Sequence, residues 1–72
     1  MEQKLIAVVA AALRVPVSAL DLETAPGDVE AWDSLGHINV VSEVEAEFDV
    51  SIPIEHIAEI QRIGDFLPYL GK

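Results

Sequence analysis

The segment 34–48, SLGHINVVSEVEAEF, constrains the fold of this chain more than any other part of the sequence. At about 100° per residue, one side of a helix here carries His37, Val40, Val41, Val44 and Phe48. The opposite side carries Leu35, Ile38, Ser42 and Ala46, flanked by Glu43, Glu45 and Glu47. No run in the chain alternates with the period of a strand, and no Asn-Gly or Asp-Gly hairpin turn occurs. We therefore expect an all-α fold.

Three further helices are predicted around this segment. Residues 2–14 form an apolar helix that ends before Pro16 and turns inward Leu5, Val8, Val9, Ala12 and Leu13. A short helix runs from Ile54 to Ile60 and turns inward Ile54, Ile57 and Ala58. A last helix spans 61–70, is kinked or shortened by Pro68, and buries Ile63, Phe66, Leu67 and Leu70. The result is a four-helix bundle with three longer helices and one short one.

The long first loop, residues 15–33, contains Pro16, Pro26 and Gly27 and has no sustained period. Loops of this length in compact domains are usually functional or disordered. This one is too apolar for disorder, and we expect a short helical turn near the sequence VSAL. The side chains predicted to attach the loop to the bundle are Val15, Val17, Leu20, Leu22, Val29 and Trp32.

A chain of 72 residues accommodates one domain, residues 1–72, with a thin core. The apolar run 5–13 is too short to span a bilayer, and Glu2 offsets Lys4 in front of it, so we interpret it as a helix of the mature protein rather than a signal peptide. No cysteine is present, which excludes a disulfide framework and favours a cytoplasmic location.

The charge is strongly acidic, with 13 Asp and Glu against 4 Lys and Arg and a net charge of −9. Such a surface repels nucleic acid and anionic lipid, so we expect no nucleic-acid partner and no membrane insertion. It favours binding to proteins with basic patches; alternatively, the acidic residues only keep a small monomer soluble.

The motifs suggest two kinds of chemistry, nucleophilic catalysis and calcium binding, and the sequence lacks essential parts of both. Ser34 and His37 lie side by side on one helix, next to Asp33, and the sequence offers no further group to orient the imidazole. The GxSxG turn of serine hydrolases is also missing, so we expect no enzyme. A calcium loop that starts at Asp21 has Pro26 where glycine is required, so we expect no specific metal site. His37 is expected at the rim of the core and His56 on the surface of the short helix.

Ser34 remains as an acceptor of a phosphate. Asp33 is a good N-cap for the helix 34–48, which places Ser34 in its first turn. A helix N-terminus presents free N–H groups and a positive dipole end, and both favour a phosphate. Simple capping by the Asp-Ser pair is the competing interpretation.

The segment WDSLGHINVVSEVEAEFDVSIP resembles the central helix of acyl carrier proteins, with its Asp-Ser-Leu motif. Leu20, Asp21 and Thr24 resemble the family's first loop, and IQRIGDFLPYL resembles its closing helix, so the resemblance covers nearly the whole chain. It implies a four-helix bundle that catalyses nothing. It also implies that a phosphopantetheinyl transferase attaches 4′-phosphopantetheine from coenzyme A to Ser34, and that Asp33 is recognised by this transferase.

The resemblance further divides the helix 34–48 between two roles. Acyl-loading and acyl-processing enzymes with basic patches would dock on Leu35, Ile38, Ser42, Glu43, Glu45 and Glu47. An acyl chain held as a thioester would insert into a cavity lined by Val40, Val44, Phe48, Ile57 and Ile63.

Three features depart from the pattern of fatty-acid carriers: Trp32, the GHI that follows Leu35, and Ser42. They favour a specialised carrier dedicated to one pathway. Fatty-acid, polyketide or specialised-lipid cargo stays open, as does an aminoacyl, peptidyl or D-alanyl carrier. An alternative of another class is a helical protein-interaction module without a prosthetic group.

Overall fold

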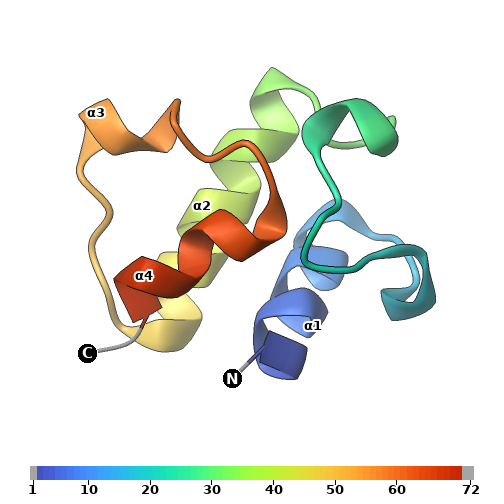
Figure 1. Ribbon diagram of the computed structural model, residues 1–72, viewed down its shortest axis with the longest axis horizontal. Helices are drawn as coiled ribbons and strands as arrows, with labels where there is room; N and C mark the ends of the chain where they lie inside the picture. The colour runs from blue at the N-terminus through green and yellow to red at the C-terminus, as the bar shows by residue number, and fades with distance from the viewer. Residues whose placement is uncertain (1, 71–72) are drawn as a thin grey trace.

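A computed structural model describes residues 2–70, and every regular element among them is helical (Figure 1). In chain order these are α1 (Glu2–Leu13), the 3₁₀ turns η1 (Val17–Ala19) and η2 (Pro26–Asp28), α2 (Ser34–Phe48), α3 (Ile54–Ile57), η3 (Ile63–Phe66) and α4 (Leu67–Leu70). η3 runs directly into α4, so the fold has three longer helical segments and one short one. The predicted all-α bundle is confirmed. Within the described residues, no helix is long and apolar enough to cross a membrane.

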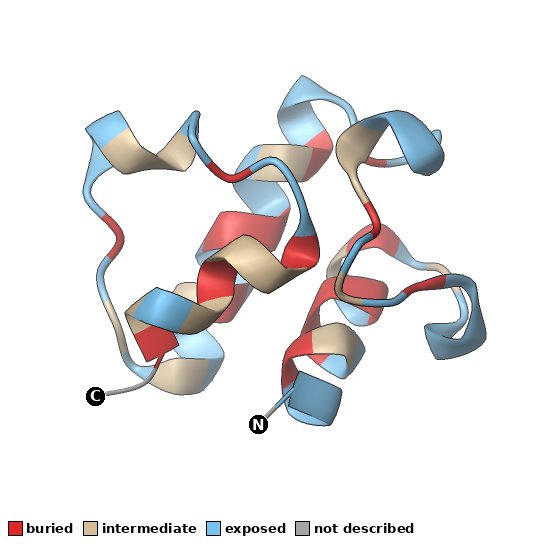
Figure 2. Ribbon diagram, viewed as in Figure 1, coloured by how far each residue is buried: buried red, intermediate tan, exposed pale blue. Residues whose placement is uncertain are grey.

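The core lies where α1, α2 and the η3–α4 segment meet, with the most extensive helix–helix contact between α1 and α2 (Figure 2). The predicted inward side of α2 is confirmed for Val40, Val41 and Val44, whereas Phe48 is only half-buried. α1 buries the predicted residues except Ala12, which is half-buried, and buries Ala10 in addition. The largest fully buried side chains are those of Trp32, Phe66, Leu5, Ile63, Val9, Val40 and Val44.

The loop between α1 and α2 packs onto the bundle through Leu20, Thr24 and Trp32, which are all buried. The predicted turn near VSAL is confirmed as η1, but Val17 is exposed and does not attach the loop. Main-chain bonds join the middle of the loop to η3. The amide of Ile63 donates to the carbonyl oxygen of Thr24 at 3.0 Å, and the amide of Gly64 donates to that of Leu22 at 2.9 Å.

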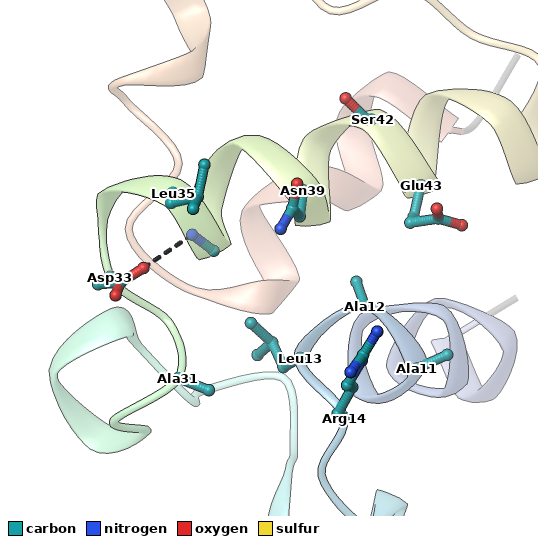
Figure 3. A pocket seen from close by; sticks show the side chains of 11 residues that line it. Ala11, Ala12, Leu13, Arg14, Ala31, Asp33, Leu35, Asn39, Ser42 and Glu43 are labelled. Carbon is teal, nitrogen blue, oxygen red and sulfur yellow. Dashed lines mark hydrogen bonds between the residues drawn. The ribbon is translucent and has the colours of Figure 1, made fainter.

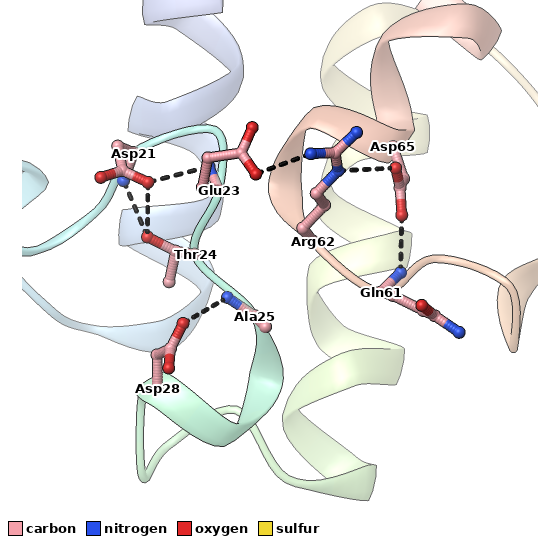
Figure 4. Close-up of polar contacts among 8 residues, drawn as sticks. All are labelled: Asp21, Glu23, Thr24, Ala25, Asp28, Gln61, Arg62 and Asp65. Carbon is pink, nitrogen blue, oxygen red and sulfur yellow. Dashed lines mark hydrogen bonds and ion pairs between the residues drawn. The ribbon is translucent and has the colours of Figure 1, made fainter.

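An ion-pair cluster at the surface reinforces the same junction (Figure 4). Arg62 Nη1 lies 2.6 Å from a carboxylate oxygen of Glu23 in the loop, and its Nε donates to Asp65 at 3.2 Å. The hydrogen bond to Glu23, with a smaller one to Asp65, raises the pKa of Arg62. The amide of Gln61, with a smaller contribution from Arg62, lowers the pKa of Asp65. The side chains are partly exposed, so the cluster orients the loop more than it stabilises the fold.

The prediction for the short helix was partly wrong. α3 ends at Ile57 rather than Ile60, Ile54 is 81% exposed, and Ala58 is also exposed. After Ile57 the chain continues in a tight turn, with the amide of Ile60 donating to the carbonyl oxygen of Ile57 at 3.3 Å. This turn sends Ile60 into the core in place of Ile54, and Ile52 enters the core ahead of the helix.

The last helical segment also differs in detail from its prediction. It begins at Ile63 instead of Gln61 and changes from 3₁₀ to α geometry at Leu67, which is half-buried rather than buried. Pro68 is the second residue of α4. A proline is tolerated in the first turn of a helix, because the amide it lacks has no partner there.

A matched pair of substitutions tests the corrected core. Ile63→Val removes a methyl group from a side chain with no exposed surface and should lower the free energy of unfolding by about 0.5–1.5 kcal/mol. Ile54→Val removes a methyl group from a side chain exposed to solvent and should change the free energy of unfolding by less than about 0.5 kcal/mol. Urea unfolding followed by circular dichroism measures both. Equal losses in the two variants would show that Ile54 is buried after all.

Candidate functional site

The N-terminus of α2 is capped by Asp33, as predicted. One carboxylate oxygen of Asp33 accepts the Gly36 amide at 2.8 Å, and its carbonyl oxygen accepts the His37 amide at 2.8 Å. Ser34 is the first residue of the helix and is exposed. Its hydroxyl therefore stands in solvent at the end of the helix where the dipole is positive and the first-turn amides lack intrahelical partners.

A chain of hydrogen bonds behind Ser34 joins the first loop, α2 and α3. The indole Nε1–H of Trp32 donates to His37 Nδ1 at 2.9 Å, and the two rings stack with centroids 6.0 Å apart. His37 Nε2 lies 2.9 Å from the carbonyl oxygen of Ile57. Since Nδ1 accepts, Nε2 carries the proton and donates to Ile57. Trp32 itself is only 1% exposed.

This arrangement corrects the expectation that no group orients His37. The imidazole of His37 is firmly oriented, whereas the sequence offered no group to orient it. Both ring nitrogens are used, however, so neither is free to accept a proton from Ser34. His37 lies at the rim of the core, as expected. His56 is half-buried rather than on the open surface, with Nδ1 2.8 Å from the Tyr69 hydroxyl.

Gly36 is required by close packing at the same place. A Cβ atom added there would lie 2.3 Å from the carbonyl oxygen of Ala31, far inside van der Waals contact. The turn of backbone that carries Trp32 into the core therefore passes directly over Gly36. The Gly-His pair after Leu35 thus has a local structural role that the sequence alone did not reveal.

The residues expected to contact partners lie mostly on the outer side of α2. Leu35 and Ile38 are 68% and 59% exposed, and Ser42, Glu43 and Glu47 are also exposed. Glu45 differs, because it is half-buried and one of its carboxylate oxygens accepts the Ile52 amide at 2.7 Å. Glu45 thus fixes the segment that follows α2.

The residues expected to line an acyl cavity lie on the inner side. Val40, Val44 and Ile63 are fully buried in the core, and Phe48 and Ile57 are half-buried beside it. They are packed against one another in this structure, and the surface hollows next to Ser34 are lined by other residues.

Two hollows flank Ser34. The larger, about 580 Å³, lies between the end of α1 and the first turns of α2 (Figure 3). We call it the α1–α2 groove; it is lined by Ala11, Ala12, Leu13, Arg14, Ala31, Asp33, Leu35, Gly36, Asn39, Ser42 and Glu43. The smaller, about 350 Å³, lies toward α3 and is lined by Pro26, Trp32, Asp33, Ser34, His37, Ala58 and Ile60. Among residues 2–70, no group of three or more His, Cys, Asp or Glu is placed to hold a metal ion.

Comparison with known proteins decides the family. Residues 3–70 match the family described as "Phosphopantetheine attachment site". The chain is 32% identical over 72 residues to an acyl carrier protein of Porphyromonas gingivalis, covering all of this chain and 92% of that protein. It is 27% identical over its whole length to an acyl carrier protein of Rickettsia bellii, covering 84% of that protein. This chain belongs to the acyl carrier protein family.

Members of this family are carriers rather than catalysts, and their prosthetic group is 4′-phosphopantetheine. The surroundings of Ser34 fit that group. An exposed hydroxyl offers a point for a phosphodiester, and the positive end of α2 favours its charge. When bound, the group supplies the thiol that this cysteine-free chain lacks. The Asp33 cap and the Trp32–His37 contact fix the backbone on either side of Ser34.

The packing at Gly36 leads to a test with a matched control. Gly36→Ala would place its Cβ against the Ala31 carbonyl, and overpacking of this kind should lower the free energy of unfolding by about 1–3 kcal/mol. This loss is opposite in sign to the usual effect of alanine in a helix. Gly27→Ala, where nothing lies within 4 Å, should not destabilise the protein. Chemical unfolding of both variants measures the difference, and a stabilised Gly36→Ala protein would contradict the packing.

Proposed function

We propose that this protein is an acyl carrier whose Ser34 bears 4′-phosphopantetheine and which presents acyl intermediates as thioesters to biosynthetic enzymes. A single observation carries the proposal: Ser34 is an exposed hydroxyl on the first residue of a capped helix, within the region that matches the attachment family. A separate phosphopantetheinyl transferase joins the arm from coenzyme A to the Ser34 oxygen by a phosphodiester. Asp33, the adjacent cap, lies where that transferase must approach.

The other hydroxyl groups among the described residues support this choice. Thr24 is buried and bonded to Asp21, and the Tyr69 hydroxyl contacts His56. The remaining exposed serines, Ser18, Ser42 and Ser51, do not stand at the N-terminus of α2. Only Ser34 combines exposure with the positive end of a long helix.

The outer side of α2 is proposed as the docking surface for the enzymes that load and process the cargo. It combines the exposed apolar side chains of Leu35 and Ile38 with Glu43 and Glu47 at its border. Exposed apolar patches bordered by charge are typical of protein contact sites. The acidic border would attract partners with basic patches. Glu45 is left out of this surface because it bonds to Ile52.

The cargo is proposed to be an acyl rather than an aminoacyl group, because the similar proteins are named acyl carrier proteins. A 43% identical stretch of 35 residues in a probable acyl carrier protein of Caulobacter vibrioides, covering 49% of this chain and 41% of that protein, supports the same choice. Residues 1–72 are proposed to act as one monomeric carrier domain in the cytoplasm, where a cysteine-free chain loses nothing by the absence of disulfides.

Modification by a transferase tests the attachment residue. Incubation with coenzyme A, magnesium and a phosphopantetheinyl transferase should raise the intact mass by one phosphopantetheine unit. Ser34→Ala should show no increase, because its side chain lacks the acceptor oxygen. Ser42→Ala, another exposed serine on α2, should be modified like the parent. Modification of the Ser34→Ala variant, or of none of the proteins, would refute the assignment.

Charge reversal tests the docking surface. Glu43→Lys with Glu47→Lys should slow the transferase reaction roughly tenfold, since favourable charge accelerates association. Added salt should slow the transferase reaction of the parent protein and have less effect on that of the variant, because salt screens the attraction that the substitutions remove. Glu59→Lys, an exposed position outside this surface, is the matched control. Equal rates for the double variant and the control would exclude a steering role for the α2 acids.

A further inference from the structure

The α1–α2 groove reaches the proposed attachment point. Asp33 and Leu35, on either side of Ser34, both line it, and it continues along α2 to Ser42 and Glu43 (Figure 3). Its opposite wall is the last turn of α1, where Ala11 and Ala12 have side chains too small to fill the space. A volume of about 580 Å³ lies within the range of small-molecule sites in proteins, about 300–1,000 Å³.

Of the polar side chains that line this groove, Asp33 accepts the Gly36 amide, whereas three others have no side-chain partner among residues 2–70. Within residues 2–70, no side-chain hydrogen bond or ion pair joins Arg14, Asn39 or Ser42 to another residue. In Figure 3, Asn39 points from α2 toward α1, and Arg14 at the end of α1 lines the groove as well. The groove therefore offers hydrogen-bond donors beside small apolar surfaces.

The backbone directs Arg14 to this place. The amide of Val15 donates to the carbonyl oxygen of Ala10 at 3.0 Å and that of Arg14 to Ala11 at 3.3 Å, which is the Schellman ending of a helix. Arg14 occupies its left-handed position with a φ of 59°, where glycine is usual. The cation thus lines the groove in a chain of net charge −9.

We propose that the α1–α2 groove binds the pantetheine portion of the prosthetic arm when no partner enzyme holds it. The inference rests on the proposed attachment at Ser34. The arm carries amide carbonyls and a hydroxyl, which match the donors of Arg14, Asn39 and Ser42. Its branched methyl groups match the apolar surface of Leu35 and of the α1 alanines.

Covalent attachment makes weak contacts sufficient. A group tethered beside its site is present at an effective concentration in the millimolar range, so no high intrinsic affinity is needed. The contacts are exposed to water and few in number, and they release the arm when an enzyme competes for it. A resting site of this kind suits a carrier that must surrender its arm to successive enzymes.

The smaller hollow on the other side of Ser34 is the competing resting place, and its chemistry is less suitable. There the Trp32 indole N–H is already bonded to His37, whose second nitrogen faces the Ile57 carbonyl. Apart from Ser34 itself, the rest of its lining is Pro26, Asp33, Ala58 and Ile60, and the Asp33 carboxylate accepts hydrogen bonds but donates none. An arm placed there would find no free side-chain donor for its amide carbonyl oxygens beyond the attachment point.

Nuclear Overhauser spectroscopy of the holo-protein tests the proposal, with the arm carried in carbon-13-labelled form from labelled coenzyme A. Contacts should appear between the methyl groups of the arm and the methyl groups of Ala11 and Ala12. Contacts with the Trp32 ring and Ile60 instead would place the arm in the smaller hollow and overturn the proposal. So would the absence of any contact beyond Ser34 and its neighbours.

Two substitutions on one face of α1 give the matched comparison. Ala11→Trp fills the groove and should abolish the contacts with the arm, moving its resonances toward those of free pantetheine. Ala7→Trp, at an exposed position one turn earlier and outside the groove, should retain them. Retained contacts in Ala11→Trp would overturn the proposal. Intact mass reports attachment separately: a normal mass gain without groove contacts removes only this inference, whereas no mass gain also removes the proposed function.

Discussion

The burial of Trp32 is the interaction on which the rest of this structure depends. In a chain of 72 residues its indole is the largest buried side chain, and it comes from the loop rather than from a helix. Its N–H would cost about 1–3 kcal/mol if left without a partner, and His37 on α2 satisfies it. The same imidazole also forms a hydrogen bond with the carbonyl oxygen of Ile57 on α3. One tryptophan thus joins loop, α2 and α3 directly behind Ser34.

This contact changes how the departures from the fatty-acid carrier pattern are interpreted. By resemblance alone, Trp32 and the Gly-His pair suggested a specialised cargo. In the structure they form one packing unit, in which Gly36 admits the Ala31 carbonyl and His37 bonds the indole. Each residue requires the others, so together they explain how the loop closes over α2. This packing accounts for the three residues without reference to the acyl group, and a specialised cargo stays a prediction from the resemblance.

Sequence reasoning predicted the helix bounds correctly where a strong helical period and a cap coincide. It failed where tertiary contacts determine which residues are buried. α2 was predicted to the residue, because Asp33 and the spacing of Val40 and Val44 act together. Near α3 the apolar residues Ile54, Ile57 and Ile60 fit several short helices equally well. Packing selected the one that buries Ile60. The environment of His37 was missed for the same reason, since one of its partners lies 20 residues away along the chain. The left-handed backbone of Arg14 had no signal in the sequence at all.

The position of the α1–α2 groove couples the proposed arm site to the proposed docking surface. Leu35 and Ser42 belong to both, so an enzyme seated on α2 and an arm resting in the groove would compete for the same side chains. Competition of this kind is reciprocal, because the arm in the groove weakens docking by the same factor by which docking weakens the arm's binding to the groove. A carrier therefore benefits from a groove that binds weakly. The exposed donors and the small alanine wall meet that requirement better than a deep apolar cavity would, since they hold the arm without opposing its transfer.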